Sequence, residues 1–167
     1  MKKKLLILIV VLLALSMVSL PAFAGKPQEA AGTWWYRPSQ PPEEKLAGGN
    51  LHMKLADEGF WEGTFAGDST DYGFAIIHAD GHWTYKGWVL LDPVTVDGET
   101  GSIEMRVNGS RSDGFSDWTG TWVITGGAGE LENLRGQGKW WGPGWQGDPD
   151  FYGEILYAGN YHFAPDK

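Results

Sequence analysis

Residues 117–141, DWTGTWVITGGAGELENLRGQGKWW, decide the fold of this chain. The first part alternates as a strand does, with Trp122 and Ile124 on the face that we expect to be buried. The glycine-rich run 126–129 follows, and glycine permits the tight reversal that the chain then needs. The last part returns as a second strand with regularly spaced glycines. The stretch therefore predicts two neighbouring strands that meet at a corner of a closed sheet.

The connection and the returning strand have a structural role at each marked position. Leu131 and Leu134 have the spacing of one helical turn, so we expect them to close the bottom of a barrel. Glu130 can accept backbone N–H groups of the glycine turn. Gly136 and Gly138 lie two apart, hence on one face of the returning strand, and leave room for a large side chain such as tryptophan. The stretch is therefore informative about the fold, and we do not expect reactive groups in it.

The chain from residue 43 onward has the periodicity of strands. No window keeps a 3.6-residue apolar repeat, and the 25 glycines are spread along the chain, where each would cost about 0.5–1 kcal/mol inside a helix. Short runs alternate with a period of two instead; Ile103, Met105 and Val107 share one face of such a run and polar residues occupy the other. The predicted strands are 45–57, 60–65, 72–78, 82–91, 101–108, 118–124, 136–141 and 151–163.

Short turns join these strands. Residues 79–81, Asp97-Gly98 and Asp113-Gly114 have hairpin chemistry, because glycine accepts positive φ. Short loops imply that strands adjacent in sequence pair in space. The sequence therefore predicts an all-β domain with a single antiparallel β-barrel of about eight strands, which leaves no open sheet edge. A two-sheet sandwich is the alternative.

The run 118–138 resembles the signature of the allene oxide cyclase-like barrel superfamily. The shared pattern is W-x-I-x-G-G/T-x-G-E-L-x-x-L-x-G-x-G, and the hairpin rhythm extends the resemblance over residues 45–163. The superfamily also includes dirigent proteins and uncharacterised secreted bacterial proteins, which this chain resembles most. The resemblance implies a calycin-type barrel. The polar residues on which the cyclases and dirigent proteins depend do not map onto this chain by motif, so activity would follow by analogy of fold alone.

The N-terminus has the composition of a secretory signal. Lys2, Lys3 and Lys4 precede the apolar run 5–20, and Pro21-Ala22-Phe23-Ala24 follows. These features predict a signal peptide over residues 1–24, with cleavage after Ala24. A lysine-led signal is usual in bacteria, and we expect the product to be periplasmic or extracellular with no stable membrane anchor after cleavage. An uncleaved anchor is the alternative, although the run is shorter than the roughly 20 residues that a spanning helix needs.

Charge and cysteine content restrict the partners. The chain has 21 Asp and Glu against 13 Lys and Arg, and no cysteine. The acidic balance argues against nucleic acid and anionic lipid as partners, because both require clusters of Lys and Arg. The absence of disulfides means that the exported domain must be held together by its core. The sequence does not indicate the oligomeric state.

The predicted domain organisation has three parts. Residues 25–42 contain four prolines around Trp34-Trp35-Tyr36. Proline excludes a helix and a central strand, so this stretch is expected to be an extended lead-in whose aromatics pack on the domain or cap an opening. Residues 43–167 are the expected barrel domain.

Ten tryptophans are the second unusual feature. Such rings either fill a core or line a ligand pocket, and both interpretations remain open here. Trp83 and Trp88 are five apart in one strand and must face opposite sides, as must Trp140 and Trp141. Together with Trp145 and Tyr152 of a glycine-rich loop, the second pair is a candidate rim platform for an apolar ligand or a sugar ring. The predicted ligand-binding residues are Trp61, Trp83, Trp88 and Trp140, with Glu62, His78 and Glu104 as candidate inward polar groups.

Catalytic and metal motifs are weak or missing. The sequence has no G-x-S-x-G, no cysteine nucleophile and no P-loop. His78, Asp80 and His82 flank one hairpin and are candidate metal ligands, although Asp80 already has a role in the turn. No cofactor or resident metal is expected. The predicted function is non-catalytic binding of a small, partly apolar or aromatic molecule in the barrel or at its mouth; the alternatives are a cavity-type isomerase or cyclase, and a structural or surface-interaction protein.

Overall fold

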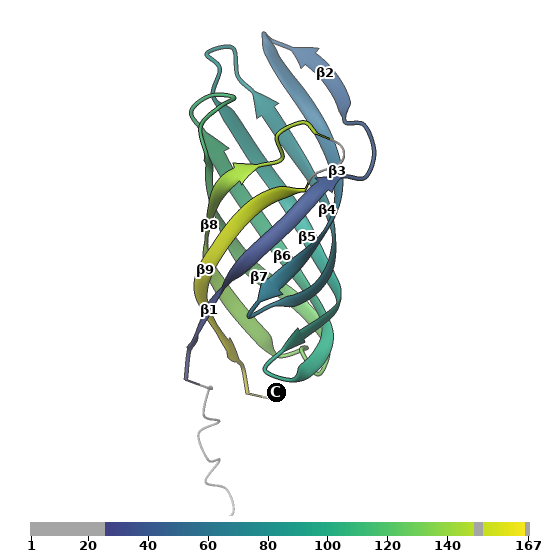
Figure 1. Ribbon diagram of the computed structural model, residues 1–167, viewed down its shortest axis with the longest axis vertical. Helices are drawn as coiled ribbons and strands as arrows, with labels where there is room; N and C mark the ends of the chain where they lie inside the picture. Colours follow the sequence, from purple (N-terminus) through teal and green to yellow (C-terminus); the bar gives the residue numbers. More distant parts are fainter. Residues whose placement is uncertain (1–25, 149–151, 166–167) are drawn as a thin grey trace, which may run out of the picture.

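The computed structural model describes residues 26–148 and 152–165, so the expected signal peptide lies outside the described residues. These residues form nine antiparallel strands (Figure 1). Their bounds are β1 Gln28–Pro38, β2 Glu43–Ala47, β3 Asn50–Gly63, β4 Ala66–Ile77, β5 Trp83–Val96, β6 Glu99–Arg111, β7 Trp118–Gly129, β8 Leu134–Gly144 and β9 Gly153–Phe163. The described part contains no helix long and apolar enough to cross a membrane.

The strands close into an eight-stranded barrel with one additional strand, as the sequence predicts. Their order is β1-β9-β8-β7-β6-β5-β4-β3-β2, and an extra pairing between β1 and β3 closes the ring. All neighbours from β3 to β9 are adjacent in sequence, because their hairpin loops are short. At the β5–β6 turn both Asp97 and Gly98 have positive φ, as the Asp-Gly pair predicts.

The first described segment is a barrel strand and not a lead-in. β1 pairs with β9 on one side and with β3 on the other, so that Trp34 lies opposite both Ile155 and Trp61. The prediction that prolines exclude a central strand here is wrong. The reason is their position: Pro38 is the last residue of β1, and the other described prolines of this stretch lie outside the strand.

β3 is one long strand where the sequence suggested a break near residue 58. Its first half, Asn50 to Lys54, pairs with β2, and its second half, from Asp57 onward, pairs with β1. Ser39 extends the β1 edge by donating its backbone N–H to the carbonyl oxygen of Ala56 at 2.9 Å. β2 therefore stands beyond the barrel wall at the end opposite the C-terminus (Figure 1).

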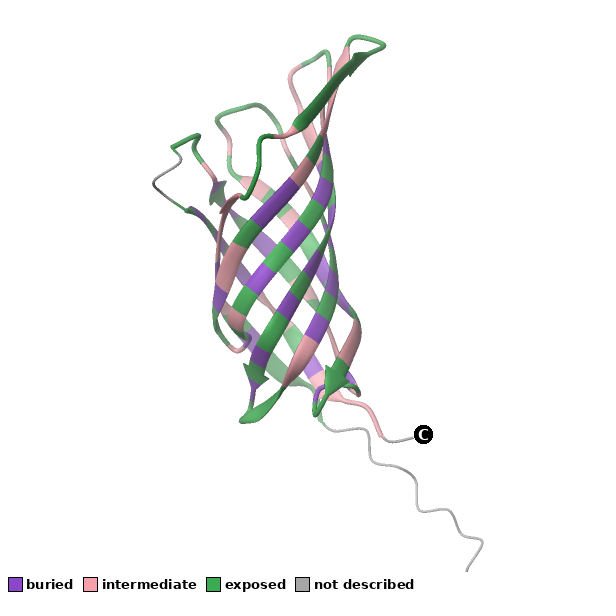
Figure 2. Cartoon of the chain, turned by 90° about the vertical axis from the view of Figure 1, so that its right-hand side faces the viewer, coloured by how far each residue is buried: buried purple, intermediate pink, exposed green. Residues whose placement is uncertain are grey.

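Buried and exposed residues alternate along the strands (Figure 2). In β6, Ile103, Met105 and Val107 are buried and the intervening Glu104 and Arg106 are exposed, as predicted. This alternation places one face of each strand in the barrel interior and the other in solvent.

Large inward side chains lie over glycines of the neighbouring strands. Trp122 on β7 lies across Gly138 and Gly159; a β-carbon at either glycine would stand 2.6 Å from the indole ring. The indole N–H donates to the carbonyl oxygen of Lys139 at 3.1 Å. The predicted role of Gly138 is thus confirmed. The same arrangement recurs for Tyr85 over Gly73 and Gly87, for Trp140 over Gly109 and Gly120, and for Tyr157 over Gly32.

The β7–β8 corner closes the lower end of the barrel. Leu131 and Leu134 are fully buried there, as predicted. β7 runs to Gly129, longer than expected, because its glycines continue to pair with β6 and only Gly129 has positive φ. Glu130 accepts a backbone N–H at 2.8 Å, but from Thr100 of the neighbouring turn and not from the glycine run.

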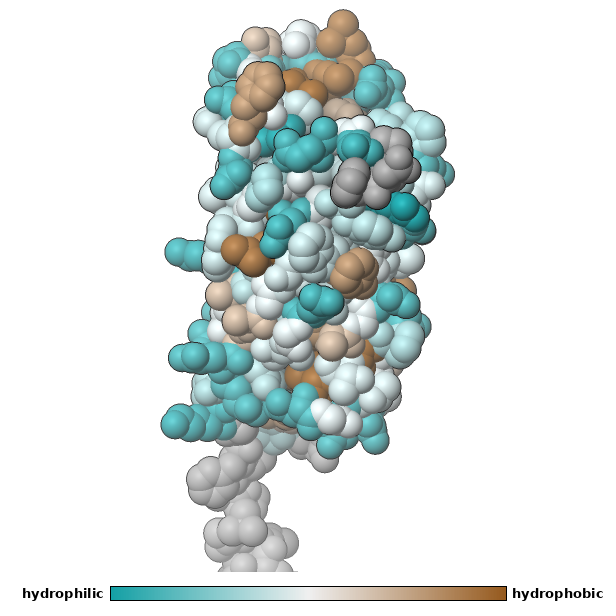
Figure 3. All heavy atoms as spheres, viewed as in Figure 1, coloured by the Kyte–Doolittle hydropathy of each residue, from teal (hydrophilic) through white to brown (hydrophobic). Residues whose placement is uncertain are grey.

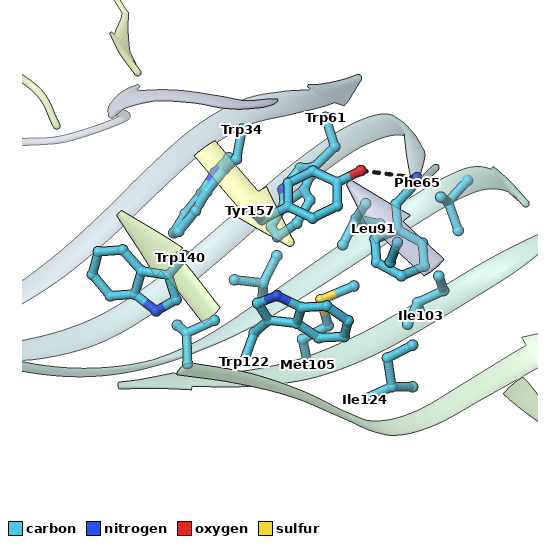
Figure 4. Close-up of a cluster of buried hydrophobic side chains, with 14 of the residues drawn as sticks. Trp34, Trp61, Phe65, Leu91, Ile103, Met105, Trp122, Ile124, Trp140 and Tyr157 are labelled. Atoms are coloured by element: carbon cyan, nitrogen blue, oxygen red, sulfur yellow. Dashed lines mark hydrogen bonds between the residues drawn. The ribbon is translucent and has the colours of Figure 1, made fainter. Parts of the chain in front are cut away.

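The lower interior is filled with aromatic and aliphatic side chains (Figure 4). Trp34 stacks on Trp61 with ring centroids 5.2 Å apart, and Tyr157 stacks on Phe65 at 5.5 Å. The Tyr157 hydroxyl accepts the N–H of Phe65 at 3.0 Å and donates to the carbonyl oxygen of Glu62 at 3.1 Å. β9 is thereby fastened to the β3–β4 turn, and the barrel is not an open tube.

Candidate functional site

The upper end of the barrel opens into a cavity of about 810 Å³. Its walls come from β1, the link to β2, strands β3 to β7, the β6–β7 loop and residues 145–147. Apolar side chains gather at this end of the molecule (Figure 3), where Leu46 and Phe115 are among the most exposed apolar residues. The volume lies within the range of about 300–1,000 Å³ that small-molecule sites occupy.

A smaller chamber of about 50 Å³ lies against this cavity. The two spaces share Tyr36, Leu55, Asp57 and Trp118. Five aromatic residues line the chamber, and Asp57 is its one charged residue. The aromatic residues are Trp34, Tyr36, Tyr85, Trp118 and Trp140.

The carboxyl group of Asp57 is almost completely removed from water. Asp57 on β3 is the registered partner of Asp71 on β4, and they are only 7% and 0% exposed. Burial raises the pKa of Asp57 to about 6, because desolvation penalises the charged form. Asp57 is therefore ionised at neutral pH and protonated in mild acid.

Asp71 lies beside Asp57 without a compensating partner. Burial, then the charge of Asp57, raise the pKa of Asp71 well above its usual range. Hydrogen bonding from the side chains of Ser69 and Trp34 lowers this pKa, but it does not offset the two causes that raise it. Neither carboxyl oxygen has a hydrogen bond of normal geometry among the described residues. Two neighbouring carboxyls in an aromatic interior favour a state in which they hold one proton between them.

Arg111 lies at the mouth on two indole rings. Its guanidinium carbon is 3.9 Å from the ring centroid of Trp83 and 4.8 Å from that of Trp118. Burial lowers the pKa of Arg111, and its buried Nε finds no hydrogen-bond acceptor in the described part of the chain. The aromatic faces therefore hold this cation in place of a carboxylate.

Tyr36 connects the barrel wall to the loop after β8. Its hydroxyl accepts the backbone N–H of Trp145 at 3.2 Å, which fixes one side of the opening. Burial raises the pKa of Tyr36 to about 12, so the phenol remains neutral.

The tryptophans proposed from sequence fall in four different environments. Trp83 lines the mouth and Trp140 lines the lower chamber. Trp61 is buried deeper, in the filled core. Trp88 is on the outer surface, 47% exposed, and contacts Phe74, so it is not part of the cavity. The predicted opposite orientation of Trp83 and Trp88 is confirmed.

The expected aromatic rim is only partly present. Trp140 is buried while Trp141 is exposed, which confirms that they face opposite sides. Trp145 lines the cavity. Tyr152 instead packs against Phe60 and against Arg37, with ring-centre distances of 5.5 Å and 4.9 Å.

The polar groups expected to point inward do not do so. Glu62 and Glu104 are exposed, because each occupies the outward position in the alternation of its strand. His78 is half-buried in the β4–β5 hairpin, where its Nε2 is 3.1 Å from the hydroxyl of Thr84. These three residues are not among those that line the mouth cavity or its chamber.

The histidine hairpin is arranged as a stacked pair. The rings of His78 and His82 lie 3.8 Å apart and almost parallel, and Asp80 is bonded to Nδ1 of His82. Within the described ranges, no cluster of three or more His, Asp or Glu residues has the geometry of a metal site.

The residues that make the site were missed because they come from separate strands. Asp57 is the last residue of the predicted strand 45–57, and Asp71 directly precedes the predicted strand 72–78. In β4 the aromatic residues Tyr72 and Phe74 point outward while Asp71, Gly73 and Ala75 point inward. A useful signal would have been the small residue at every second position, since small side chains leave space for an aromatic ring from the adjacent strand.

Comparisons with known proteins support the fold. No family model and no curated protein matches the chain. A solved structure of a protein of unknown function from the DUF3224 family of Shewanella oneidensis MR-1 is similar: it is 20% identical, covers 84% of this chain and 100% of its own, and has a TM-score of 0.63. At this identity the likeness concerns the barrel alone, and the allene oxide cyclase-like resemblance is supported only to that extent.

Proposed function

We propose that this protein is an exported barrel that binds a small, partly apolar molecule at its open end. The observation that carries the proposal is an aromatic-lined cavity of about 810 Å³ above a filled core. A sealed interior with no pocket at either end would have argued against such a role. The signal-like composition of residues 1–24 supports export.

The shape of the interior favours binding over a purely structural role. The core below Trp34 and Trp61 supplies the packing that the fold needs, whereas the side chains at the mouth leave space unfilled. Apolar walls with a few polar groups are typical of ligand sites. Four charged residues line the mouth. Arg37 and Glu58 form an ion pair with each other at 2.9 Å, whereas Asp57 and Arg111 would orient a molecule there.

A neutral fluorescent probe tests this proposal directly. We expect N-phenyl-1-naphthylamine to gain fluorescence on binding to the full chain. Leu55→Trp adds bulk where the two cavities meet, and should weaken probe binding at least tenfold. Leu156→Trp is the matched control, because Leu156 is exposed on the outer surface of β9. Absence of probe binding, or equal loss in both variants, would overturn the proposal.

Mass spectrometry under non-denaturing conditions can identify the occupant. The protein purified from its own host should carry a small molecule that Leu55→Trp no longer retains. A mass common to both proteins would indicate an adduct elsewhere on the surface.

A cavity-type isomerase is the second candidate, favoured by the two inward carboxyl groups, Asp57 and Asp71. This activity would need the bound molecule to leave chemically rearranged at unchanged mass. Recovery of the occupant unaltered after prolonged incubation would eliminate it.

A further inference from the structure

We propose that the lower chamber is a cage for an ammonium group, and that the ligand of the mouth cavity therefore carries a positively charged nitrogen at one end of an apolar body. This inference rests on the proposed function and specifies the chemical class of its ligand. It depends on three observations: the aromatic walls of the chamber, the carboxyl group within it, and the unbalanced carboxyl beside that group.

The walls of the chamber suit a cation. The ring of Trp34 packs against those of Tyr36 and Trp140, with centroid separations of 5.1 Å and 6.3 Å. Trp118 adds a further ring, 6.2 Å from Trp140. The negative face of an aromatic ring attracts a cation, and cages of such rings recognise methylated ammonium groups. The same molecule already uses this interaction for Arg111, over Trp83 and Trp118.

The size of the chamber fits a head group. Its volume of about 50 Å³ is several times the roughly 10–15 Å³ that one water needs by a comparable measure. The larger cavity above, of about 810 Å³, takes the rest of the molecule. Asp57, Tyr36, Leu55 and Trp118 line both spaces, so a ligand with its charge below and its apolar part above would contact them continuously.

The carboxyl groups supply the charge that the cage lacks. Asp57 faces the chamber, and Asp71 beside it is fully buried, with no hydrogen bond of normal geometry to either carboxyl oxygen in the described part of the chain. A buried charge without a partner is unfavourable, so the charge of ionised Asp57 is costly in this interior. A cation in the chamber would offset that cost.

The other charged and titratable groups around Asp57 define the expected pH dependence. Asp71 lies beside it on β4, Tyr36 on β1, Tyr85 on β5 and Arg111 on β6. Arg37 and Glu58 line the same mouth and form an ion pair with each other. Burial raises the pKa of both tyrosines, so they are neutral below pH 9, and Arg111 stays charged. Asp57 is then the group that gains charge near pH 6, and cation binding should strengthen as the pH rises through that value.

The test compares benzyltrimethylammonium with neopentylbenzene, its uncharged isostere, on the full chain by calorimetry. At pH 8 we expect the cation to bind at least tenfold more tightly than the isostere. The preference should fall about tenfold at pH 5, where roughly one Asp57 in ten is ionised, and in Asp57→Asn at pH 8. Asp68→Asn is the matched control, because Asp68 is exposed on the outer face of β4.

The outcomes separate this inference from the proposed function. If both probes bind equally, or if the isostere binds more tightly, the ammonium cage is wrong and binding of an apolar molecule stands. If neither compound nor the naphthylamine binds, both proposals fail. If Asp57→Asn does not fold, the pH series on the unaltered protein decides, because a preference independent of pH between 5 and 8 excludes Asp57 as the recognising group.

Discussion

Asp57 and Asp71 are registered partners across β3 and β4, and both side chains lie inside the barrel. On the inward faces of β3 and β4 near this pair, the other residues are apolar, aromatic or glycine, with the exception of Ser69. Burial of these two carboxyl groups therefore destabilises the folded state, and such destabilising residues are typical of functional sites.

Asp57→Asn should stabilise the protein at neutral pH. The folded-state pKa of Asp57 is raised from 3.8 to about 6. The stabilisation that protonated Asp57 gives the folded state is therefore fully present below about pH 4, and it is lost as the pH rises through 6. A shift of this size corresponds to about 3 kcal/mol. Urea unfolding between pH 4 and 8 should show a steeper decline in the unaltered protein than in the variant, in which the buried Asp71 still has a raised pKa.

Asp68→Asn is the control for that series and should leave the profile unchanged. Parallel curves for the unaltered protein and Asp57→Asn would mean that Asp57 gains a charge partner that the structure does not contain.

Tyr157→Phe should destabilise the barrel by about 1–3 kcal/mol, because it leaves the buried N–H of Phe65 without an acceptor. The carbonyl oxygen of Glu62 loses its donor at the same time. Urea midpoints measure the effect. Tyr72→Phe removes the same hydroxyl from an exposed tyrosine on β4 and should change the midpoint little; similar losses in both variants would contradict the proposed fastening of β9.

Gly138→Ala should cost on the order of 1–3 kcal/mol, since the added β-carbon would stand 2.1 Å from the carbonyl oxygen of Ala158 and 2.6 Å from the indole ring of Trp122. Differential scanning calorimetry should show a lower melting temperature. Gly114→Ala is the comparison: a β-carbon there has no atom within 4 Å, and its φ is not positive. An unchanged melting temperature for Gly138→Ala would show that Trp122 and the β9 backbone at Ala158 can both move away at no cost.

Removal of β1 should abolish folding. A chain that begins at Ser39 lacks the strand between β9 and β3, so two edges and the indole of Trp61 would be left uncovered. We expect no near-ultraviolet circular dichroism and no cooperative unfolding transition. A chain that begins at Lys26 keeps β1 and should unfold cooperatively. If the chain that begins at Ser39 also folds, β1 is not required for the barrel.

Much of the wall could be predicted from the sequence because alternation is a local property. Ile103 and Met105 were placed inside correctly, and Trp140 and Trp141 on opposite sides. Leu131 was also correctly expected at the closed end. These residues follow rules that involve only their nearest neighbours in the chain.

The interior site could not be predicted in the same way, because it depends on the registration of separate strands. Asp57 and Asp71 become neighbours only when β3 and β4 pair. In β4 the usual rule that apolar side chains point into the core is reversed, since Phe74 points outward and Gly73 inward. Tyr85 occupies the space that Gly73 leaves, so the apolar volume is supplied by another strand.

β1 was missed for a related reason. The proline content of residues 25–42 as a whole argues against a strand, whereas only the position of each proline within the ladder matters. Pro38 ends the strand and so interrupts nothing.

The pairing of β1 with β9 has a consequence for the order of folding. These strands are the first and last elements of the described chain, and each is the other's neighbour. The hairpins from β3 to β9 can form one after another as the chain emerges, but the ring cannot shut until the final strand exists. Closure should therefore be a single late event that depends on contacts distant in sequence, which are slow to form. Damage to either end of the chain should open the same seam.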